Sequence, residues 1–250
     1  ENASDEILYT MPEESEAHEG TWLQWPHHFQ YGLTYRNEID PTWVAMTKTL
    51  VTSEKVHIIA YDETEKTRII ALLTAANVSL TNIDFKIYQT DDVWVRDNGP
   101  IYVKDKNGNL VIEDWGFNGW GEKADFEKCD LIPAKIGVDQ NRTVINLNNE
   151  MVNEGGAVEI DGNGTLLATK SAILNTNRNP GLSQADAEAI FKTYLGVTNV
   201  IWLDGVAGLE ITDMHIDGFA RFGNATTIVT MNQANLLEWD VAQTDINKLY

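Results

Sequence analysis

The 250-residue sequence contains a single cysteine, Cys129, and few basic residues. One cysteine cannot form a disulfide within the chain, nor can it supply the several thiolates of a zinc cluster. The 18 lysines and arginines are outnumbered by 38 acidic residues, so the formal net charge is −20. Such a chain repels nucleic acid and anionic membrane surfaces and attracts cations. We therefore expect a cationic ligand, with neither nucleic acid nor a membrane as a partner.

Long apolar runs are also missing, since none approaches the roughly 18 residues that a membrane span needs. At this length the default is one packed unit with a sizeable core, and we expect residues 1–250 to form a single domain. The chain begins at Glu1 and not at Met, so we expect that an initiator or leader has been removed. The cellular compartment is left open.

Three segments share one plan: a polar start, a short apolar strand, a Gly/Asn turn and a second strand. This pattern is typical of β-hairpins. The segments start at Asp97, Glu154 and His215, and their turns lie at 106–109, 161–164 and 223–224. A period of about 60 residues predicts repeated units around an axis.

Helices and single strands are predicted between these hairpins. Asp40 and Pro41 predict the N-cap and first turn of one helix, and a strand over 56–61 precedes a helix over 62–77. Ser183, with an acidic residue three positions later, predicts another helix start, and Gly196 its end.

A further strand is predicted at 200–203 and a final helix at 234–250. Another strand and hairpin would follow that helix if the repeat continued. We therefore expect the chain to be cut short by at least one unit.

Four polar residues occupy the starts of the hairpins. Asp97, Glu154 and His215 stand at matching positions, so the repeat predicts that they meet near the axis. Asp217 lies two residues after His215, and side chains two apart on a strand point to the same face. Three carboxylates and an imidazole in one pocket need a positive partner, which is either a metal ion or an organic cation.

Both kinds of partner have support. A His-x-Asp pair with two further acids makes an oxygen-rich metal site, but the hairpins contain no second histidine at ligand spacing, and His27 and His28 lie far away in sequence. A guanidinium fits better, because its planar fork of donors matches paired carboxylates such as Asp97 and Asp217. Asp97 alone is also explained as a turn-capping residue.

Aromatic side chains near the hairpin starts suit a cation as well. Trp94 or Trp115 would add cation–π attraction, although ordinary core packing explains these tryptophans equally well.

Several stretches resemble, at the family's own spacing, the agmatine deiminases and the related bacterial, Porphyromonas-type peptidylarginine deiminases of the pentein superfamily. They cover nearly the whole chain: 11–22, 25–26, 92–100, 114–121, 154–156, 177–180 and 215–217. The resemblance implies an α/β fold, the pentein-type α/β propeller of repeated αββαβ units around a pseudo-fivefold axis. In this chain the propeller would be incomplete and truncated at its C-terminal end.

The resemblance also implies roles for the four residues. Asp97 and Asp217 would bind a guanidinium, Glu154 would aid its positioning, and His215 would be the general acid and base. Asp213 is expected to contact the substrate. The implied substrate is a small cationic guanidine, with no metal and no organic cofactor, and the question of a homo-oligomer is left open.

One departure concerns the nucleophile. The family uses a cysteine in a Gly-Gly-Gly-x-x-His-Cys stretch near the C-terminus, and no such stretch occurs here. Cys129 lies between hairpins, so we expect it to be a packing residue or a passive thiol. The nucleophile would belong to a missing unit, and this chain alone should not turn over substrate.

A second departure concerns specificity. Ile211 and Met214 stand where many agmatine deiminases have an acidic residue and a glycine. Agmatine, giving N-carbamoylputrescine and ammonia, is the leading substrate. The alternatives are arginine or peptidylarginine, giving citrulline, and an inactive guanidinium-binding module. Deimination of arginine would need an arginine side chain to bind a carboxylate or peptide backbone. The candidates are Arg96 and Arg178, which lie inside the family motifs, and Arg36, Arg68, Arg142 and Arg221, which have no clear pocket role.

Overall fold

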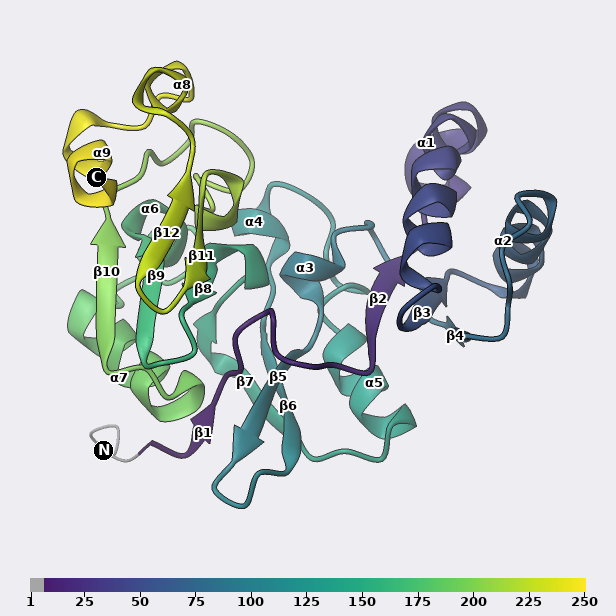
Figure 1. The fold of residues 1–250 in the computed structure, drawn as a ribbon, viewed down its shortest axis with the longest axis horizontal. Helices are drawn as coiled ribbons and strands as arrows, with labels where there is room; N and C mark the ends of the chain where they lie inside the picture. Colours follow the sequence, from purple (N-terminus) through teal and green to yellow (C-terminus); the bar gives the residue numbers. More distant parts are fainter. Residues whose placement is uncertain (1–6) are drawn as a thin grey trace. The chain divides into compact units, whose positions relative to one another are not determined.

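A computed structural model of the protein describes residues 7–250. The chain divides into two compact units. The smaller unit comprises Ala17–Val95 and Asp125–Ile132, and the larger one comprises the segment up to Glu16 with Arg96–Ala124 and Pro133–Tyr250. Figure 1 shows the elements of both units. The expectation that residues 1–250 form one domain stays a prediction.

The smaller unit contains a three-stranded parallel sheet and two helices. Strand β3 (Lys55–Ala60) lies between β2 (Gly20–Gln24) and β4 (Ile83–Ile87). The helices are α1 (His28–Leu50) and α2 (Glu63–Ala75). The helix predicted over 62–77 is confirmed as α2, and Asp62 caps it by accepting a hydrogen bond from the amide of Glu65. Ile58 and Ile69 are fully buried between sheet and helices.

The predicted start of a helix at Asp40 was wrong. Helix α1 already begins at His28, bends at Gly32 (φ 67°) and runs on through Pro41. Asp40 is buried inside the helix, where it accepts a hydrogen bond from the indole of Trp25 and pairs with Arg68. The Asp40 carboxylate therefore makes tertiary contacts and does not cap a helix.

The larger unit contains the three predicted hairpins. They are β5–β6 (Ile101–Asp105 and Leu110–Gly116), β8–β9 (Val158–Ile160 and Thr165–Thr169) and β11–β12 (Ala220–Asn224 and Thr227–Thr230). Each is preceded by one short helical turn: α3 (Val95–Asn98), η1 (Gly155–Ala157) and η2 (Ile216–Gly218). The repeat is therefore a turn followed by a hairpin.

Two of the hairpins gain a parallel third strand. Strand β7 (Val144–Val152) pairs with β6, and β10 (Asn199–Leu203) pairs with β9. The short strand β1 (Tyr9–Thr10) adds to β5. The fold is a mixed α/β structure of several sheets, as predicted. The closing of these sheets into a propeller stays a prediction.

Helices connect the sheets of the larger unit. The capping box of Ser183 and Asp186 begins α7 (Gln184–Leu195), and Gly196 ends it in the left-handed conformation (φ 73°), both as predicted. The remaining helices are α4 (Gly119–Glu122), α5 (Ile132–Asp139), α6 (Lys170–Ile173), α8 (Gln233–Glu238) and α9 (Gln243–Leu249). Among residues 7–250, no helix is both long and apolar enough to cross a membrane.

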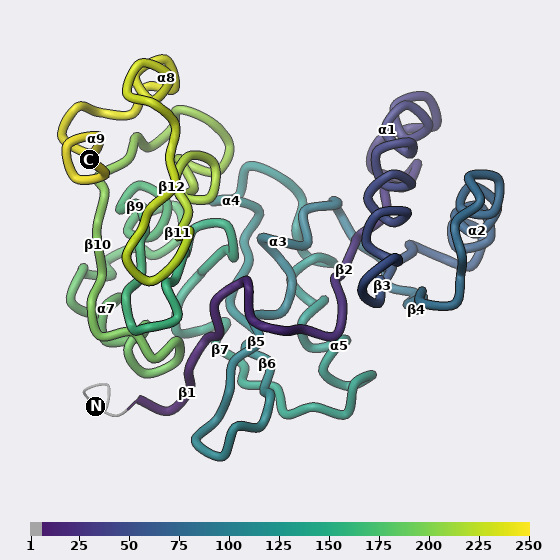
Figure 2. The backbone as a smooth tube through the Cα atoms, viewed as in Figure 1, coloured from purple at the N-terminus to yellow at the C-terminus, as the bar shows by residue number. Residues whose placement is uncertain are grey.

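The single helix predicted over 234–250 is in fact two helices. The chain leaves α8 at Trp239, takes a left-handed conformation at Asp240 (φ 58°) and re-enters helix at Gln243. Figure 2 shows both helices in yellow, with α9 beside the end of β10. Asp245 fixes α9 there by accepting hydrogen bonds from the amides of Asp204 and Gly205.

A buried carboxyl group on β6 predicts a pH-dependent stability. Glu113 is 0% exposed, and only one of its oxygens has a hydrogen-bond donor, the indole of Trp115. Burial raises the pKa of Glu113 well above 4.5, against the opposing effect of that hydrogen bond. Folding therefore takes up a proton, and stability falls as pH rises above the unfolded pKa.

We expect the substitution Glu113→Gln to remove this loss of stability at high pH. The variant should match the unaltered protein near pH 4 and gain up to about 1.4 kcal/mol per pH unit above it, until the folded pKa is passed. Thermal unfolding between pH 4 and pH 9 measures the effect. Glu150→Gln, at an exposed position of β7, is the control. If the stabilities of Glu113→Gln and the unaltered protein changed with pH in parallel, a raised pKa of Glu113 would be contradicted.

Candidate active site

The turns that precede the hairpins carry the four predicted residues. Asp97 lies in α3, Glu154 and His215 are the N-caps of η1 and η2, and Asp217 lies within η2. The expectation that His215 and Asp217 share a strand face was wrong, because both belong to a helical turn.

Gly156 marks the point where three of the four side chains converge. A Cβ atom at Gly156 would lie 2.6 Å from His215 Nδ1, 2.7 Å from Asp97 Oδ1 and 2.9 Å from Asp217 Oδ2. Real Cβ atoms essentially never approach so closely, so only glycine leaves these three side chains in place. The sequence pattern places Gly156 within a family motif but gives no hint of this role.

The Asp97 carboxylate is oriented by two donors. The backbone amide of Gly156 donates to Oδ1 at 3.1 Å, and the indole N–H of Trp120 donates to Oδ2 at 2.9 Å. Trp120 is buried and has an unusual left-handed backbone conformation (φ 59°). A bulky residue rarely adopts this conformation unless tertiary contacts impose it, and the bond to Asp97 is one such contact.

His215 lies between two carboxylates. Its Nε2 is 2.9 Å from Glu154 Oε2, and its Nδ1 is 3.5 Å from Asp97 Oδ1. A carboxylate only accepts hydrogen bonds, so Nε2 carries the proton toward Glu154. Glu154 thus sets both the orientation and the tautomer of the imidazole.

The ionisation of the site reflects burial and crowding of like charges. Burial raises the pKa of Asp97, and the charges of Glu154 and Asp217 add to the rise. Burial also raises the pKa of Asp217, where His215 acts in the opposite direction. For His215, burial opposes the charged form, but the Glu154 hydrogen bond and the charge of Asp97 raise its pKa overall. A cation bound between Asp97 and Asp217 would relieve the repulsion.

Arg178 and Asp213 form a buried network beside the site. Arg178 Nε donates to both oxygens of Glu154, at 2.7 and 2.9 Å. Arg178 also pairs with Asp213, which Lys123 and the amide of Gly208 contact as well. These contacts leave the Arg178 side chain 0% exposed and that of Asp213 1% exposed. Their structural contacts do not favour the predicted roles, in which Arg178 binds a substrate carboxylate and Asp213 the substrate.

The predicted aromatic residues lie in different places. Trp115 is buried in the core of the larger unit, with its ring edge-on to Tyr194. This position favours the core-packing alternative. Trp94 belongs to the smaller unit and is 56% exposed.

Met214 shows why a glycine suits its position. Its φ is 72°, in the left-handed region that favours glycine. The side chain is buried among Leu203 and Phe219, which offsets the backbone strain. The departure from the family pattern is thus accommodated by packing, whereas Ile211 remains half exposed.

Cys129 has the surroundings of an unreactive thiol. It is buried in the smaller unit, where its sulfur accepts hydrogen bonds from the amides of Asp91 and Asp92. Burial raises the pKa of the thiol to about 11, so the thiolate is scarce at neutral pH.

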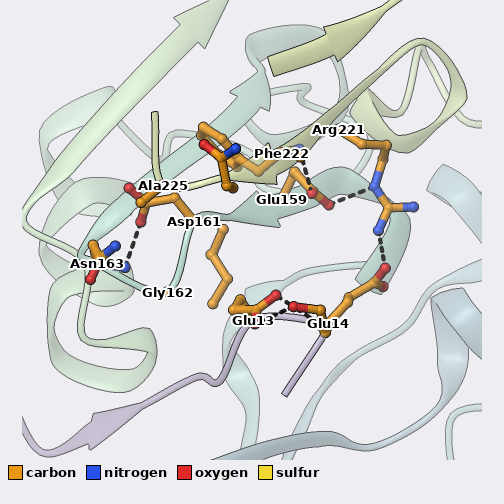
Figure 3. A pocket seen from close by; sticks show the side chains of 13 residues that line it. Glu13, Glu14, Glu159, Asp161, Gly162, Asn163, Arg221, Phe222 and Ala225 are labelled. Atoms are coloured by element: carbon orange, nitrogen blue, oxygen red, sulfur yellow. Dashed lines mark hydrogen bonds and ion pairs between the residues drawn. The ribbon is translucent and has the colours of Figure 1, made fainter. Parts of the chain in front are cut away.

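A separate hollow of about 650 Å³ lies between the segment around Glu14 and the turns of the β8–β9 and β11–β12 hairpins. Figure 3 shows Arg221 crossing one side of it, paired with Glu159 and Glu14. Glu14 also pairs with Arg96. None of the four site residues lines this hollow. Across the described residues 7–250, no group of three or more His, Cys, Asp and Glu side chains is placed to bind a metal ion.

The arrangement suits a small planar cation and proton transfer. In the described part of the chain, Asp217 forms no hydrogen bond, so its oxygens are available to a ligand, as are the remaining lone pairs of Asp97. His215 lies beside both carboxylates with a fixed ring orientation. A guanidinium in this position would present its carbon and nitrogens to the imidazole.

Comparisons with known proteins identify the family of this chain. The family model described as Porphyromonas-type peptidyl-arginine deiminase matches residues 10–248. The agmatine deiminase of Pseudomonas aeruginosa (strain LESB58) is 33% identical over 96% of this chain and 63% of its own length. That of Stutzerimonas stutzeri (strain A1501) is 35% identical over 86% of this chain and 58% of its own length.

Solved structures show the same fold. C. jejuni agmatine deiminase with a cysteine-to-serine substitution and substrate bound is 26% identical, with a TM-score of 0.81 over 97% of this chain and 69% of that one. The agmatine deiminase of Enterococcus faecalis is 25% identical, with a TM-score of 0.84 over 96% of this chain and 66% of that one.

This chain thus spans about three fifths of the length of these two curated relatives. Its sequence match and its fold extend over nearly all of its own length. The chain belongs to the Porphyromonas-type peptidyl-arginine deiminase family.

Proposed function

We propose that the full-length protein is an agmatine deiminase-type hydrolase that converts a guanidinium substrate and water to a carbamoyl product and ammonia. The observation that carries this proposal is the convergence of Asp97, His215 and Asp217 around Gly156. Two available carboxylates beside an oriented imidazole supply cation binding and proton transfer in one place.

Asp97 and Asp217 bind the guanidinium. Burial raises the pKa of each carboxyl group, so each costs free energy to ionise in the empty site. A permanently charged guanidinium provides the missing positive charge and fixes its own orientation through its planar fork of N–H donors.

His215 transfers protons in two steps. A nucleophile attacks the guanidinium carbon, and His215 donates a proton to the nitrogen that leaves as ammonia. His215 then accepts a proton from water, which attacks the covalent intermediate and releases the carbamoyl product. Glu154 holds the ring through Nε2 in both steps.

The nucleophile is a cysteine that lies outside these 250 residues. Cys129 is a poor candidate, since its thiol is buried and its pKa is about 11. The C. jejuni relative carries a cysteine-to-serine substitution together with bound substrate, which supports a cysteine role in that enzyme. Further αββαβ units would complete a propeller around the site described here.

Agmatine is the favoured substrate class, because it has no carboxylate to be bound. Arg178 is fully buried, and Arg96 and Arg221 are paired with Glu14. A substrate carboxylate would have to displace Glu14 from these arginines. The second candidate, deimination of arginine or peptidylarginine, is supported by the family description.

The test is product analysis with the full-length protein. Agmatine should give ammonia and N-carbamoylputrescine in equal amounts. Citrulline from arginine, with no product from agmatine, would favour the second candidate. If neither substrate reacts but agmatine binds, the protein is an inactive guanidinium-binding module and the proposal is wrong.

A further inference from the structure

Arg178 contacts the two residues that hold His215 in place, Glu154 at its ring and Thr212 at its backbone amide. On one side its Nε donates to Glu154, whose Oε2 lies 2.9 Å from the imidazole Nε2. On the other side its Nη2 donates to the carbonyl of Thr212 at 3.1 Å, and its Nη1 donates to Asp213 at 2.5 Å. The hydroxyl of Thr212 accepts a hydrogen bond from the backbone amide of His215 at 3.1 Å. One guanidinium thus links the ring partner and the backbone partner of His215.

The shape of the arginine side chain matters for this link. Its Nε and its two terminal nitrogens are all used, and they point in three directions set by the planar group. A lysine carries the same charge but has a single nitrogen. It can pair with Glu154 or with Asp213, but it cannot connect Glu154 to both Asp213 and the carbonyl of Thr212.

Removing Arg178 would take a cationic partner from two buried carboxylates, which costs free energy. The side chains of Glu154 and Asp213 are each 1% exposed, and Arg178 lies between them. Lys123 also pairs with Asp213, whereas the partners of Glu154 within the described residues are Arg178 and His215. Without Arg178, Glu154 would be a buried carboxylate paired with the imidazole alone, which favours its movement or protonation.

We propose that Arg178 is a positioning residue that fixes His215 for proton transfer, acting through Glu154 and Thr212 without touching substrate. This inference rests on the proposed function, because it assigns His215 the proton transfer. It also replaces the sequence-based role of Arg178 as a substrate carboxylate ligand.

The experiment compares Arg178→Met and Arg178→Lys in the full-length protein with agmatine as substrate. We expect kcat to fall about 10²-fold in Arg178→Met, within the range that general acid–base catalysis contributes. KM should stay within about threefold, because Asp97 and Asp217 still bind the guanidinium. Arg178→Lys should recover part of kcat by keeping the charge. A rise in KM at unchanged kcat would overturn the proposal, since it would show that Arg178 binds substrate.

A second readout separates positioning from general destabilisation and does not depend on activity. Histidine-selective NMR can follow the titration of the His215 ring, which is assigned by its loss in His215→Asn. At high pH, the neutral His215 ring in Arg178→Met should populate both tautomers in place of the single Nε2–H form, because Glu154 is no longer fixed against Nε2. A His215 ring that keeps the single Nε2–H tautomer in Arg178→Met would overturn the proposal even if kcat falls.

Two control variants complete the design. Arg142→Met removes an arginine that contacts Gln140 and the carbonyl of Leu110, away from the site, so it should leave kcat and the titration unchanged. Phe191→Leu disturbs a fully buried core position and should lower stability without changing the tautomer of His215. If the unaltered protein consumes neither agmatine nor arginine, the proposed function fails, while the NMR titration still decides the role of Arg178.

Discussion

In the full-length protein, His215→Asn is expected to lower kcat for agmatine by about 10³-fold, because the neighbouring groups cannot both donate and accept the required protons. Glu154 is already paired with Arg178, and Asp97 is oriented by Trp120 and Gly156. Ammonia release at saturating agmatine measures the effect.

The binding of agmatine should survive this substitution. The shorter asparagine side chain would not reach Glu154, but Asp97 and Asp217 remain, and loss of a positive imidazole does not weaken a site for a cation. His18→Asn is the matched control, since His18 is an exposed residue of the smaller unit paired with Glu54. A His215→Asn enzyme with more than about a tenth of the normal kcat would contradict the role of His215.

Gly156→Ala is expected to weaken both agmatine binding and turnover while the fold persists. The three atoms nearest to the added methyl group would be the side-chain ends of Asp97, His215 and Asp217, so these side chains would be displaced. Overpacking of this kind costs about 1 to 3 kcal/mol, and here it distorts the geometry of the ligand site. We expect agmatine affinity to fall at least about 10-fold and kcat about 10²-fold.

Gly108→Ala provides the contrast. Gly108 lies in the turn between β5 and β6 with a φ of 78°, and a Cβ atom there would meet no other side chain or backbone within 4 Å. Alanine at this position strains the backbone by about 1 kcal/mol without touching the site. Equal losses of activity in Gly108→Ala and Gly156→Ala would show that the effect is general destabilisation.

Much of this fold was predictable because its signals are local. The turns at 106–109 and 161–164 and the capping box at Ser183 depend on a few neighbouring residues, and they appear where they were expected. The turn predicted at 223–224 was wrong in position, because both residues belong to β11 and the chain turns at 225–226. Asp40 shows where local signals fail. Its capping pattern is overridden by tertiary partners, the indole of Trp25 and the guanidinium of Arg68, which lie 15 and 28 residues away in sequence.

The candidate site also had a part that could be predicted from the sequence and a part that could not. The spacing of Asp97, Glu154 and His215 predicted their convergence, because equivalent points of a repeat occupy equivalent places. The residues that orient these three side chains could not be identified from the sequence. Trp120 acts through an unusual backbone conformation, and Arg178 through a guanidinium whose partners Glu154 and Asp213 are 24 and 35 residues distant. The available signal was the polar motif at 177–180 that contains Arg178.

Calorimetric titration of agmatine into full-length His215→Asn and Gly156→Ala, side by side, tests the guanidinium site most directly. His215→Asn should keep the dissociation constant within about threefold of the unaltered value, whereas Gly156→Ala should raise it at least about 10-fold. This outcome would separate the carboxylates that bind the guanidinium from the imidazole that transfers protons. Equal affinity in Gly156→Ala and the unaltered protein would contradict a guanidinium site at Asp97 and Asp217.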